Sequence, residues 1–339
     1  MSKLTTDPVR WGILGVAKIA TQKVIPGMQG SPLLRIEAIA SRDQARADAA
    51  ARELGIPRAH GSYEALLTDP AIEAIYNPLP NHLHVPWTVK ALEAGKHVLC
   101  EKPISLTAEE AKLIGEAEAR TGRRAAEAFM IRFHPQWIRA REIVAAGTLG
   151  EIRAVNIMFA YNNVDPANIR NKADIGGGGL YDIGCYAIAG SRFLLGADPI
   201  KVVSLIDRDP VMGTDRLTSG LMAYPGNVQV TFTVSTQCVL RQKVHVLGTK
   251  GRLEIEVPFN TLPTRPTRIL VDDGRDIFDS GVRVEEFPAC DQYGLQGEAF
   301  SKAIRGEAAW DWPVADAVTN MRVIDALFRS ERTQGWEKP

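Results

Sequence analysis

One stretch near the start of the chain decides the fold class: residues 9–20, VRWGILGVAKIA. The apolar run Val9–Leu14 is typical of a short buried strand. Gly15 suits a tight turn, Ala17 lets a pyrophosphate approach the backbone, and Ala20 lets the following helix pack against the strand. The stretch therefore predicts a phosphate-binding strand–turn–helix unit, with alanine at the second and third glycine positions of G-x-G-x-x-G. An ordinary strand–helix turn of small residues is the alternative.

Strand and helix patterns alternate after this turn. Further strands are predicted at four apolar runs: Leu34–Ala40, Ala74–Tyr76, His97–Cys100 and Ala125–Ile131. Helical patterns lie between them, and repetition of strand, helix and strand predicts a parallel sheet with helices on both faces. We therefore expect an N-terminal α/β domain of the Rossmann, dinucleotide-binding type over residues 1–127.

The pattern changes in the second half of the chain. A long strand is predicted at Glu151–Tyr161, and a helix follows the glycine run Gly176–Gly179. More strands are predicted at Lys201–Asp207, Leu217–Tyr224, Val228–Cys238, Gln242–Leu247 and Arg252–Val257. Because short turns join these runs, the sheet should be large, open and mainly antiparallel or mixed. We expect a second α/β domain over residues 128–339, and leave open whether the last helix packs on it or on the first domain.

Composition excludes some classes of function. The chain has 339 residues, and its 40 basic residues balance 40 acidic ones. A balanced charge gives no net field to attract nucleic acid or an anionic membrane. The start of the chain lacks the apolar region of an export signal, and no stretch approaches the ~20 apolar residues of a membrane span.

The cysteines are few and scattered. Cys100, Cys185, Cys238 and Cys290 lack the paired spacing of metal ligands. We therefore expect reduced thiols in a cytoplasmic protein that binds no metal, no nucleic acid and no membrane.

The end of the second predicted strand bears on the choice of cofactor. NAD-preferring sites usually place Asp or Glu there, bound to the ribose 2′-hydroxyl. This chain offers Ser41 and Arg42, which can both donate hydrogen bonds to a 2′-phosphate. Asp43 is better explained as a helix start. The sequence therefore favours NADP over NAD, and a solvated Arg42 is the alternative.

A charged pair follows the strand predicted at His97–Cys100. Glu101 and Lys102 come at the carboxyl end of this strand, where open α/β sheets bind their ligands. Pro103 keeps Lys102 out of helical geometry and permits a cis bond. A solvated lysine in a turn is the alternative.

Asp182 and Tyr186 lie four residues apart on the helix after the glycine run, so they share one face of it. A tyrosine hydroxyl can take the proton of an alcohol as hydride leaves the carbon, if a cation stabilises the tyrosine anion. Lys102 is the candidate cation, and Asp182 is a candidate to orient the substrate hydroxyl or the lysine. The glycines Gly176–Gly179 allow close approach by a ligand or another backbone. The alternative has Tyr186 packed with its hydroxyl at the surface and Asp182 as a helix cap.

Taken in order, these residues resemble the Gfo/Idh/MocA oxidoreductases over nearly the whole chain. The resemblance is carried by Trp11–Gly15 with Ala17, by Leu79–His84 (LPNHLH), by Ala94–Pro103 (AGKHVLCEKP), by Arg132–Pro135 (RFHP), and by Gly176–Gly179 with Asp182, Gly184 and Tyr186. Many members carry His where this chain has Tyr186. Tyrosine resembles the branch that holds glucose–fructose oxidoreductase, dimeric dihydrodiol dehydrogenase and NADP-linked xylose dehydrogenase. Ile131 departs from relatives that often carry an aromatic residue there.

The resemblance implies a site and an assembly. Lys102 would lie beside the nicotinamide and the substrate, Tyr186 would transfer the proton with Asp182 beside it, and the second domain's sheet would join subunits into a homodimer or homotetramer. Asn81 would lie near the nicotinamide ribose, although a helix N-cap role is equally compatible with its position. The expected cofactor contacts are Gly15, Ala17, Lys18, Ile19, Ser41, Arg42, Leu79, Asn81, His84, Glu101, Lys102 and Arg170. His134 and Tyr161 are weaker candidates for lining the pocket.

Three functional hypotheses follow. The first is an NADP-dependent dehydrogenase or reductase acting on an aldose, a keto-sugar or a cyclic diol. The second is an enzyme that shuttles hydride between two sugars on a cofactor it does not release. The third is a non-catalytic protein that senses NADP(H), which would need neither Lys102 nor Tyr186.

Overall fold

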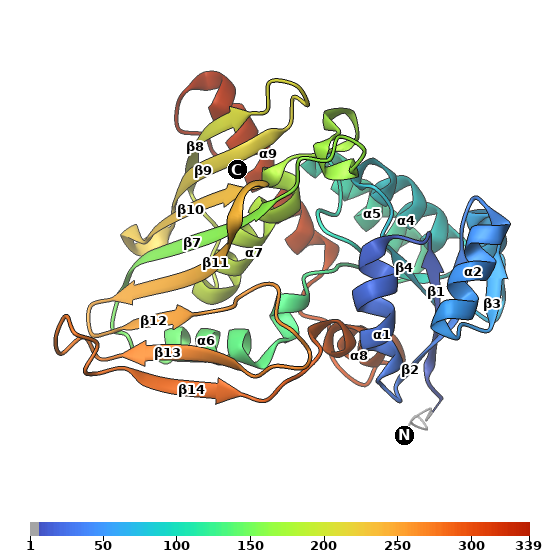
Figure 1. Cartoon of the computed structure of the whole chain (residues 1–339), viewed down its shortest axis with the longest axis horizontal. Helices are drawn as coiled ribbons and strands as arrows, with labels where there is room; N and C mark the ends of the chain where they lie inside the picture. The colour runs from blue at the N-terminus through green and yellow to red at the C-terminus, as the bar shows by residue number, and fades with distance from the viewer. Residues whose placement is uncertain (1–6) are drawn as a thin grey trace. The chain divides into compact units, whose positions relative to one another are not determined.

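The computed structural model describes residues 7–339. The chain forms two compact units, and each has its own sheet (Figure 1). The first unit holds the described part of Met1–Met130 together with Asp291–Val318. The second holds Ile131–Cys290 together with Thr319–Pro339. The chain therefore enters each unit twice.

The first unit is built on a six-stranded sheet with the order β3-β2-β1-β4-β5-β6. All neighbouring strands run parallel. The strands are β1 (Val9–Leu14), β2 (Leu34–Ala40), β3 (Arg58–His60), β4 (Ala74–Asn77), β5 (His97–Cys100) and β6 (Ala125–Glu127). This doubly wound order confirms the predicted Rossmann-type sheet, and it puts the switch point, where ligands bind, between β1 and β4.

Capping side chains and glycines mark the ends of several helices in this unit, where backbone groups lack partners within the helix. They are α1 (Ile25–Gln29), α2 (Gln44–Leu54), α3 (Tyr63–Leu67), α4 (His84–Glu93), α5 (Ala108–Thr121) and α8 (Gln292–Arg305), with a π-helical turn η1 (Ala20–Val24) before α1 and a 3-10 turn η2 (Asn81–Leu83) before α4. The Asp43 side chain accepts from Arg46 N at the start of α2, which confirms it as a helix start. Thr107 caps α5 in the same way, and Gly122 ends that helix in the left-handed conformation.

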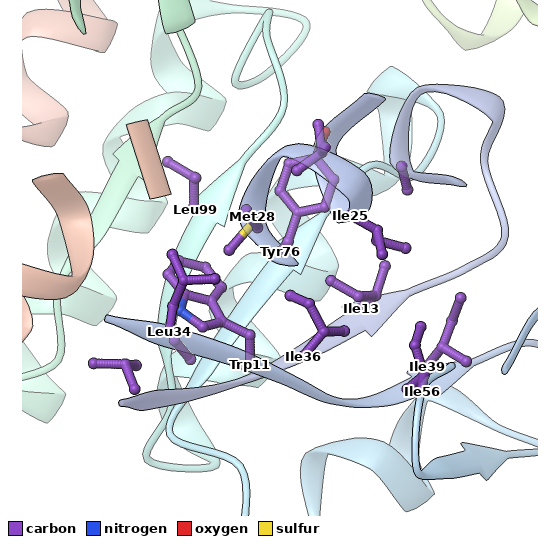
Figure 2. Close-up of a cluster of buried hydrophobic side chains, with 14 of the residues drawn as sticks. Trp11, Ile13, Ile25, Met28, Leu34, Ile36, Ile39, Ile56, Tyr76 and Leu99 are labelled. Atoms are coloured by element: carbon purple, nitrogen blue, oxygen red, sulfur yellow. The ribbon is translucent and has the colours of Figure 1, made fainter. Parts of the chain in front are cut away.

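Apolar side chains between the sheet and its helices form the core of the first unit. Figure 2 shows Trp11, Ile13 and Ile36 of the strands facing Ile25 and Met28 of α1. Each fully buried side chain of this size contributes about 1.5–3 kcal/mol to folding. Helix α8 joins the same core, because Trp11 Nε1 donates to Ser301 Oγ at 3.2 Å and the Trp11 and Phe300 ring centroids are 5.8 Å apart.

One prediction about this unit is wrong, and two of its elements were not predicted. The strand expected at Ala125–Ile131 ends at Glu127, and Met130–Phe133 form a 3-10 turn η3 instead. Strand β3 and helix α3 were not predicted. They are only three and five residues long, which is too short for a periodicity to stand out.

The second unit is built on an eight-stranded sheet with the order β14-β13-β12-β11-β7-β10-β9-β8. Strands β7 and β10 run parallel, and the other neighbours run antiparallel. The strands are β7 (Ile152–Asn162), β8 (Lys201–Arg208), β9 (Asp215–Ala223), β10 (Gln229–Ser235), β11 (Gln237–Gly248), β12 (Arg252–Ile255), β13 (Thr267–Asp272) and β14 (Arg283–Phe287). The predicted mixed open sheet is therefore confirmed, while β13 and β14 extend it beyond the strands that were predicted.

Helices cover one face of this sheet. They are α6 (Pro135–Ala145) and α7 (Cys185–Leu195), which follows a π-helical turn η6 (Leu180–Gly184), and both lie behind the strands in Figure 1. Trp137 of α6 donates from Nε1 to the Pro258 carbonyl oxygen at 2.6 Å and is fully buried. Helix α9 (Val314–Thr333) begins in the first unit and ends in the second.

No helix within residues 7–339 combines the length and the apolar character that crossing a bilayer requires.

Candidate functional site

The predicted phosphate turn lies at the carboxyl end of β1. Gly15 has a φ of +83°, and its N–H donates to the Ala40 carbonyl oxygen at 2.8 Å. A Cβ at this position would lie 3.0 Å from Leu79 Cδ2, so the position is both strained and crowded for any other residue. Lys18 is exposed, and Ala17 and Ile19 are half-buried. The turn is therefore narrow and open to ligand on the side that these residues line.

Cationic side chains lie next to this turn. Ser41 is buried and Arg42 is exposed, directly after β2. Burial raises the pKa of Tyr63, and the charges of Arg42 and Arg46 oppose that rise. Arg46 in α2 donates from its guanidinium to the Val16 carbonyl oxygen at 3.1 Å. The guanidinium that contacts the phosphate turn is thus that of Arg46, which was not expected there.

Arg46 was missed from the sequence, although a signal was present. It lies in the first turn of the predicted helix, four residues after Arg42, so a second cation follows the end of the second predicted strand. Only the contact with Val16 ties it to the phosphate turn.

The Glu101-Lys102-Pro103 loop follows β5 at the same edge of the sheet. The Lys102–Pro103 peptide bond is cis. The carboxylate of Glu101 accepts from the Tyr76 hydroxyl at 2.5 Å and from Lys102 N at 3.2 Å. Glu101 is 9% exposed. Its carboxylate therefore uses two hydrogen bonds to hold the loop. Lys102 is half-buried.

His84 links this loop to the one after β4. Its ring is 1% exposed, with Nδ1 2.7 Å from the Pro103 carbonyl oxygen and Nε2 2.6 Å from the Leu79 carbonyl oxygen. Burial lowers the pKa of His84 to about 4, whereas donation to both carbonyls together requires the imidazolium form. The lowered pKa keeps the ring neutral near pH 7, so only one of its two nitrogens donates to a carbonyl. His84 therefore acts on the site through Leu79 and Pro103.

Asn81 is the first residue of η2, directly after Pro80, and α4 begins three residues later at His84. The helix N-cap role and the role near the nicotinamide ribose both stay predictions. The Asn81 side chain is half-buried in the loop between β4 and α4.

In the second unit, Asp182 lies at the centre of a polar cluster. Its Oδ2 accepts from the Tyr161 hydroxyl at 2.6 Å and pairs with Arg170 Nε at 3.0 Å. Burial and the Asp182 charge raise the pKa of Tyr161 well above its ordinary value, so this phenol remains a hydrogen-bond donor. Asp182 lies within η6, so the alternative of a simple helix cap is wrong. Tyr161 and Arg170 instead fix its carboxylate.

Tyr186 follows one turn later, at the start of α7. Its side chain is 6% exposed, and its ring centroid lies 5.9 Å from that of Phe159 and 5.5 Å from that of Phe259. The alternative with its hydroxyl at the surface does not fit this burial. The second unit thus brings together Asp182, Tyr186, Arg170 and Tyr161, while Lys102 and the other expected cofactor contacts belong to the first unit.

The glycine run is packed against the protein itself. A Cβ on Gly177 would lie 2.6 Å from the carbonyl oxygens of Arg170 and Lys172. Gly178 has a φ of +122°, and a Cβ there would lie 1.9 Å from Asp215 Oδ1. Of the two explanations, close approach by other parts of the chain accounts for these two glycines. Asp215 carried no motif and was not predicted.

His134 has a structural role. It caps α6, with Nδ1 accepting from Gln136 N at 3.2 Å, and its Nε2 lies 3.6 Å from Cys290 Sγ. Ile131 is fully buried. Among residues 7–339, His, Cys, Asp and Glu side chains form no group of three or more that could hold a metal ion.

Comparison with known proteins places the chain. Residues 9–129 match the model of the Gfo/Idh/MocA oxidoreductase family with an NAD-binding Rossmann fold, and residues 137–254 match a C-terminal domain of the same family. A D-xylose 1-dehydrogenase (NADP+) of Haloferax volcanii is 40% identical over 95% of this chain and 97% of its own. A trans-1,2-dihydrobenzene-1,2-diol dehydrogenase of Mus musculus is 32% identical over 82% of each.

Solved structures agree with these relatives. A 3-ketoreductase from Actinomadura kijaniata, in complex with NADP and TDP-benzene, superimposes with a TM-score of 0.88 and is 28% identical over 95% of this chain and 98% of its own. K102A, K102E and Y186F variants of that ketoreductase have also been solved with NADP and TDP-benzene. The predicted resemblance is confirmed, and the chain belongs to the Gfo/Idh/MocA family of oxidoreductases with an NAD-binding Rossmann fold.

Proposed function

We propose that the chain is an NADP-dependent oxidoreductase that transfers hydride between the nicotinamide and a sugar or cyclic diol. The observation that carries the proposal is the fixed carboxylate of Asp182, one turn before Tyr186, in a member of this family. A non-catalytic NADP(H) sensor would have no use for an aspartate held by both Tyr161 and Arg170. The xylose dehydrogenase and dihydrodiol dehydrogenase relatives support this substrate class.

The residues around the first turn fit NADP. Gly15 leaves the backbone open to a pyrophosphate, and Arg42 and Arg46 bring two positive charges to the end of β2, where the ribose 2′-phosphate would lie. Acidic residues would repel that phosphate, and Asp43 is occupied in capping α2. Ser41, Lys18, Ala17, Ile19, Leu79, Asn81, Glu101 and Arg170 complete the proposed contacts. When bound, NADP would supply the hydride acceptor for oxidation, and NADPH the donor for reduction.

Side chains of the protein transfer the proton and stabilise the charge that this transfer leaves. In oxidation, the Tyr186 phenolate accepts the proton of the substrate hydroxyl while hydride leaves the carbon that bears this hydroxyl. The Lys102 ammonium stabilises the tyrosine anion electrostatically, and Asp182 orients the substrate hydroxyl. Variants at a lysine and at a tyrosine have been solved for the related 3-ketoreductase with NADP and TDP-benzene, which agrees with the choice of these two residue types.

We also propose that copies of the chain associate through the uncovered face of the second unit's sheet. Large apolar side chains are exposed on neighbouring strands: Met158, Leu205, Leu217 and Leu247. An apolar patch on a sheet face is a typical protein–protein contact. A homodimer or homotetramer is expected by light scattering, and Leu205→Asp should lower the mass. The four free cysteines support a reducing, cytoplasmic location.

The activity is tested with purified protein, NADP or NAD, and a panel of aldoses, keto-sugars and cyclic diols. NADPH absorbance should change with at least one substrate, and faster than NADH absorbance. Tyr186→Phe should lower kcat about 100-fold or more, since proton transfer by one side chain contributes ~10²–10⁴-fold. Tyr224→Phe is the matched control, because Tyr224 is buried in the same unit and its hydroxyl lies 2.9 Å from Ser191 Oγ.

Two outcomes would redirect the proposal. Binding of NADP without turnover on any substrate would favour the sensor. Cofactor that copurifies and survives dialysis would favour hydride shuttling between two sugars.

A further inference from the structure

Asp215 is a buried carboxylate to which the proposed chemistry gives no role. It is the first residue of β9 and is 1% exposed. Its Oδ2 accepts from Leu180 N at 2.5 Å and from Thr218 Oγ1 at 3.1 Å. Leu180 is the first residue of η6, the turn that carries Asp182. Asp215 therefore holds the start of that turn through its backbone.

The same carboxylate also fixes the glycine run. Its Oδ1 occupies the space where a Cβ of residue 178 would lie. On its other side the run contacts the turn that bears Arg170, because Gly178 N donates to the Arg170 carbonyl oxygen at 2.8 Å and Gly177 N donates to the Lys172 carbonyl oxygen at 2.9 Å. One carboxylate thus braces the backbone beneath both Asp182 and its partner Arg170.

We propose that Asp215 is a positioning residue, which sets the places of Asp182 and Arg170 by clamping residues 178–180. The inference rests on the proposed catalytic function of the Asp182 and Tyr186 helix. Asp215 does not touch the reacting groups in this scheme. It acts by keeping the Asp182 carboxylate at hydrogen-bond distance from Tyr161 and Arg170. A small displacement of a catalytic group lowers turnover steeply, so the clamp matters for rate more than for folding.

Charge makes the clamp depend on pH. Burial raises the pKa of Asp215 to about 6, although the Leu180 N–H, the Thr218 hydroxyl and the Arg208 charge lower it. The Tyr161 phenol is the other titratable group that its charge affects. Above pH 6 the ionised carboxylate accepts both hydrogen bonds strongly, and below pH 6 the protonated acid accepts them weakly. Turnover should therefore fall as pH drops through about 6.

Stability has the opposite dependence. A carboxyl whose pKa is raised in the folded state favours folding most at low pH, and this contribution is lost as pH rises from the ordinary aspartate pKa through about 6. The ionised Asp215 thus opposes folding at neutral pH. Asp215→Asn, which keeps the shape and one acceptor, should leave the Tm at pH 7.5 within about 3 °C of the wild type. A purely structural carboxylate would give a clear loss of Tm.

The test measures kcat, KM and Tm for Asp215→Asn between pH 5 and 8. We expect kcat to be about 10- to 100-fold lower than in the wild type and to stay constant as pH passes through 6. Asp272→Asn is the matched control, since Asp272 is also buried in this unit and pairs with Arg252 at 2.6 Å. Its kcat should match the wild type. The inference would be overturned if Asp215→Asn kept the wild-type kcat and the same fall of kcat below pH 6.

A double-mutant cycle separates this inference from the proposed function. If Asp215 acts through Asp182, adding Asp215→Asn to Asp182→Asn should lower kcat less than twofold further. Full additivity of the two changes would refute the positioning role while leaving the function intact. If Asp182→Asn alone keeps wild-type turnover, Asp182 has no catalytic role and the inference falls while the activity stands. If the wild type turns over no substrate, the proposed function itself fails.

Discussion

The Nδ1 atom of His84 lies 2.7 Å from the carbonyl oxygen of Pro103, which joins the first turn of α4 to the loop that carries Lys102. The Nε2 atom of the same ring lies 2.6 Å from the Leu79 carbonyl oxygen, and Leu79 in turn borders the phosphate turn at Gly15. One buried ring therefore connects three parts of the ligand-binding edge of the parallel sheet. A histidine suits this place because both ring nitrogens can contact an acceptor.

Removal of this ring should loosen that edge. In His84→Ala the carbonyl that accepts from the neutral ring loses its donor, and an unsatisfied buried group costs about 1–3 kcal/mol. We expect a lower Tm and, in addition, kcat about 10-fold lower, because Lys102 would no longer be held in place. His97→Ala is the control: its Nδ1 accepts from Arg124 N at 3.0 Å at the opposite end of β5. Loss of Tm with unchanged kcat in His84→Ala would argue against a link to Lys102.

Arg46 should decide between NADP and NAD together with Arg42. Each guanidinium can give the 2′-phosphate a charge-assisted hydrogen bond worth about 1.5–3 kcal/mol, or roughly 10- to 100-fold in Kd. Arg46→Ala should therefore weaken NADP binding by that factor and leave NAD binding unchanged, as measured by fluorescence titration. Arg52→Ala, on the exposed side of the same helix, should change neither. An equal loss for both cofactors would mean that Arg46 only supports the turn at Val16.

Two helical glycines should respond in opposite ways to alanine. In an exposed helix, Gly→Ala stabilises by about 1 kcal/mol. Gly115 in α5 has room, because the nearest atom to an added Cβ is Val314 Cγ1 at 3.7 Å. Gly190 in α7 has none, because a Cβ would lie 2.8 Å from Trp137 Cη2, and overpacking costs about 1–3 kcal/mol. Urea unfolding should show Gly115→Ala stabilised and Gly190→Ala destabilised, and a gain in the latter would show that Trp137 can shift.

The sequence by itself determined the architecture and the chemical groups. The run Val9–Leu14 and the turn at Gly15 predicted the Rossmann sheet, because burial and backbone conformation leave a direct mark on residue type. Ser41-Arg42, Glu101-Lys102-Pro103 and Asp182 with Tyr186 were predicted as site residues for another reason: a sequence motif keeps its residue types and their spacing together.

Tertiary structure decided what holds those groups in place. Arg46 reaches Val16 from another element, and Tyr161 and Arg170 meet Asp182 across 21 and 12 residues of chain. Asp215 lies 35 residues along the chain from Leu180, whose N–H donates a hydrogen bond to it. Such contacts depend on which strands become neighbours, and a lone charged residue in a strand carries no sign of its partner. The folded chain supplies that partner, and with it the reason for glycine at positions 177 and 178.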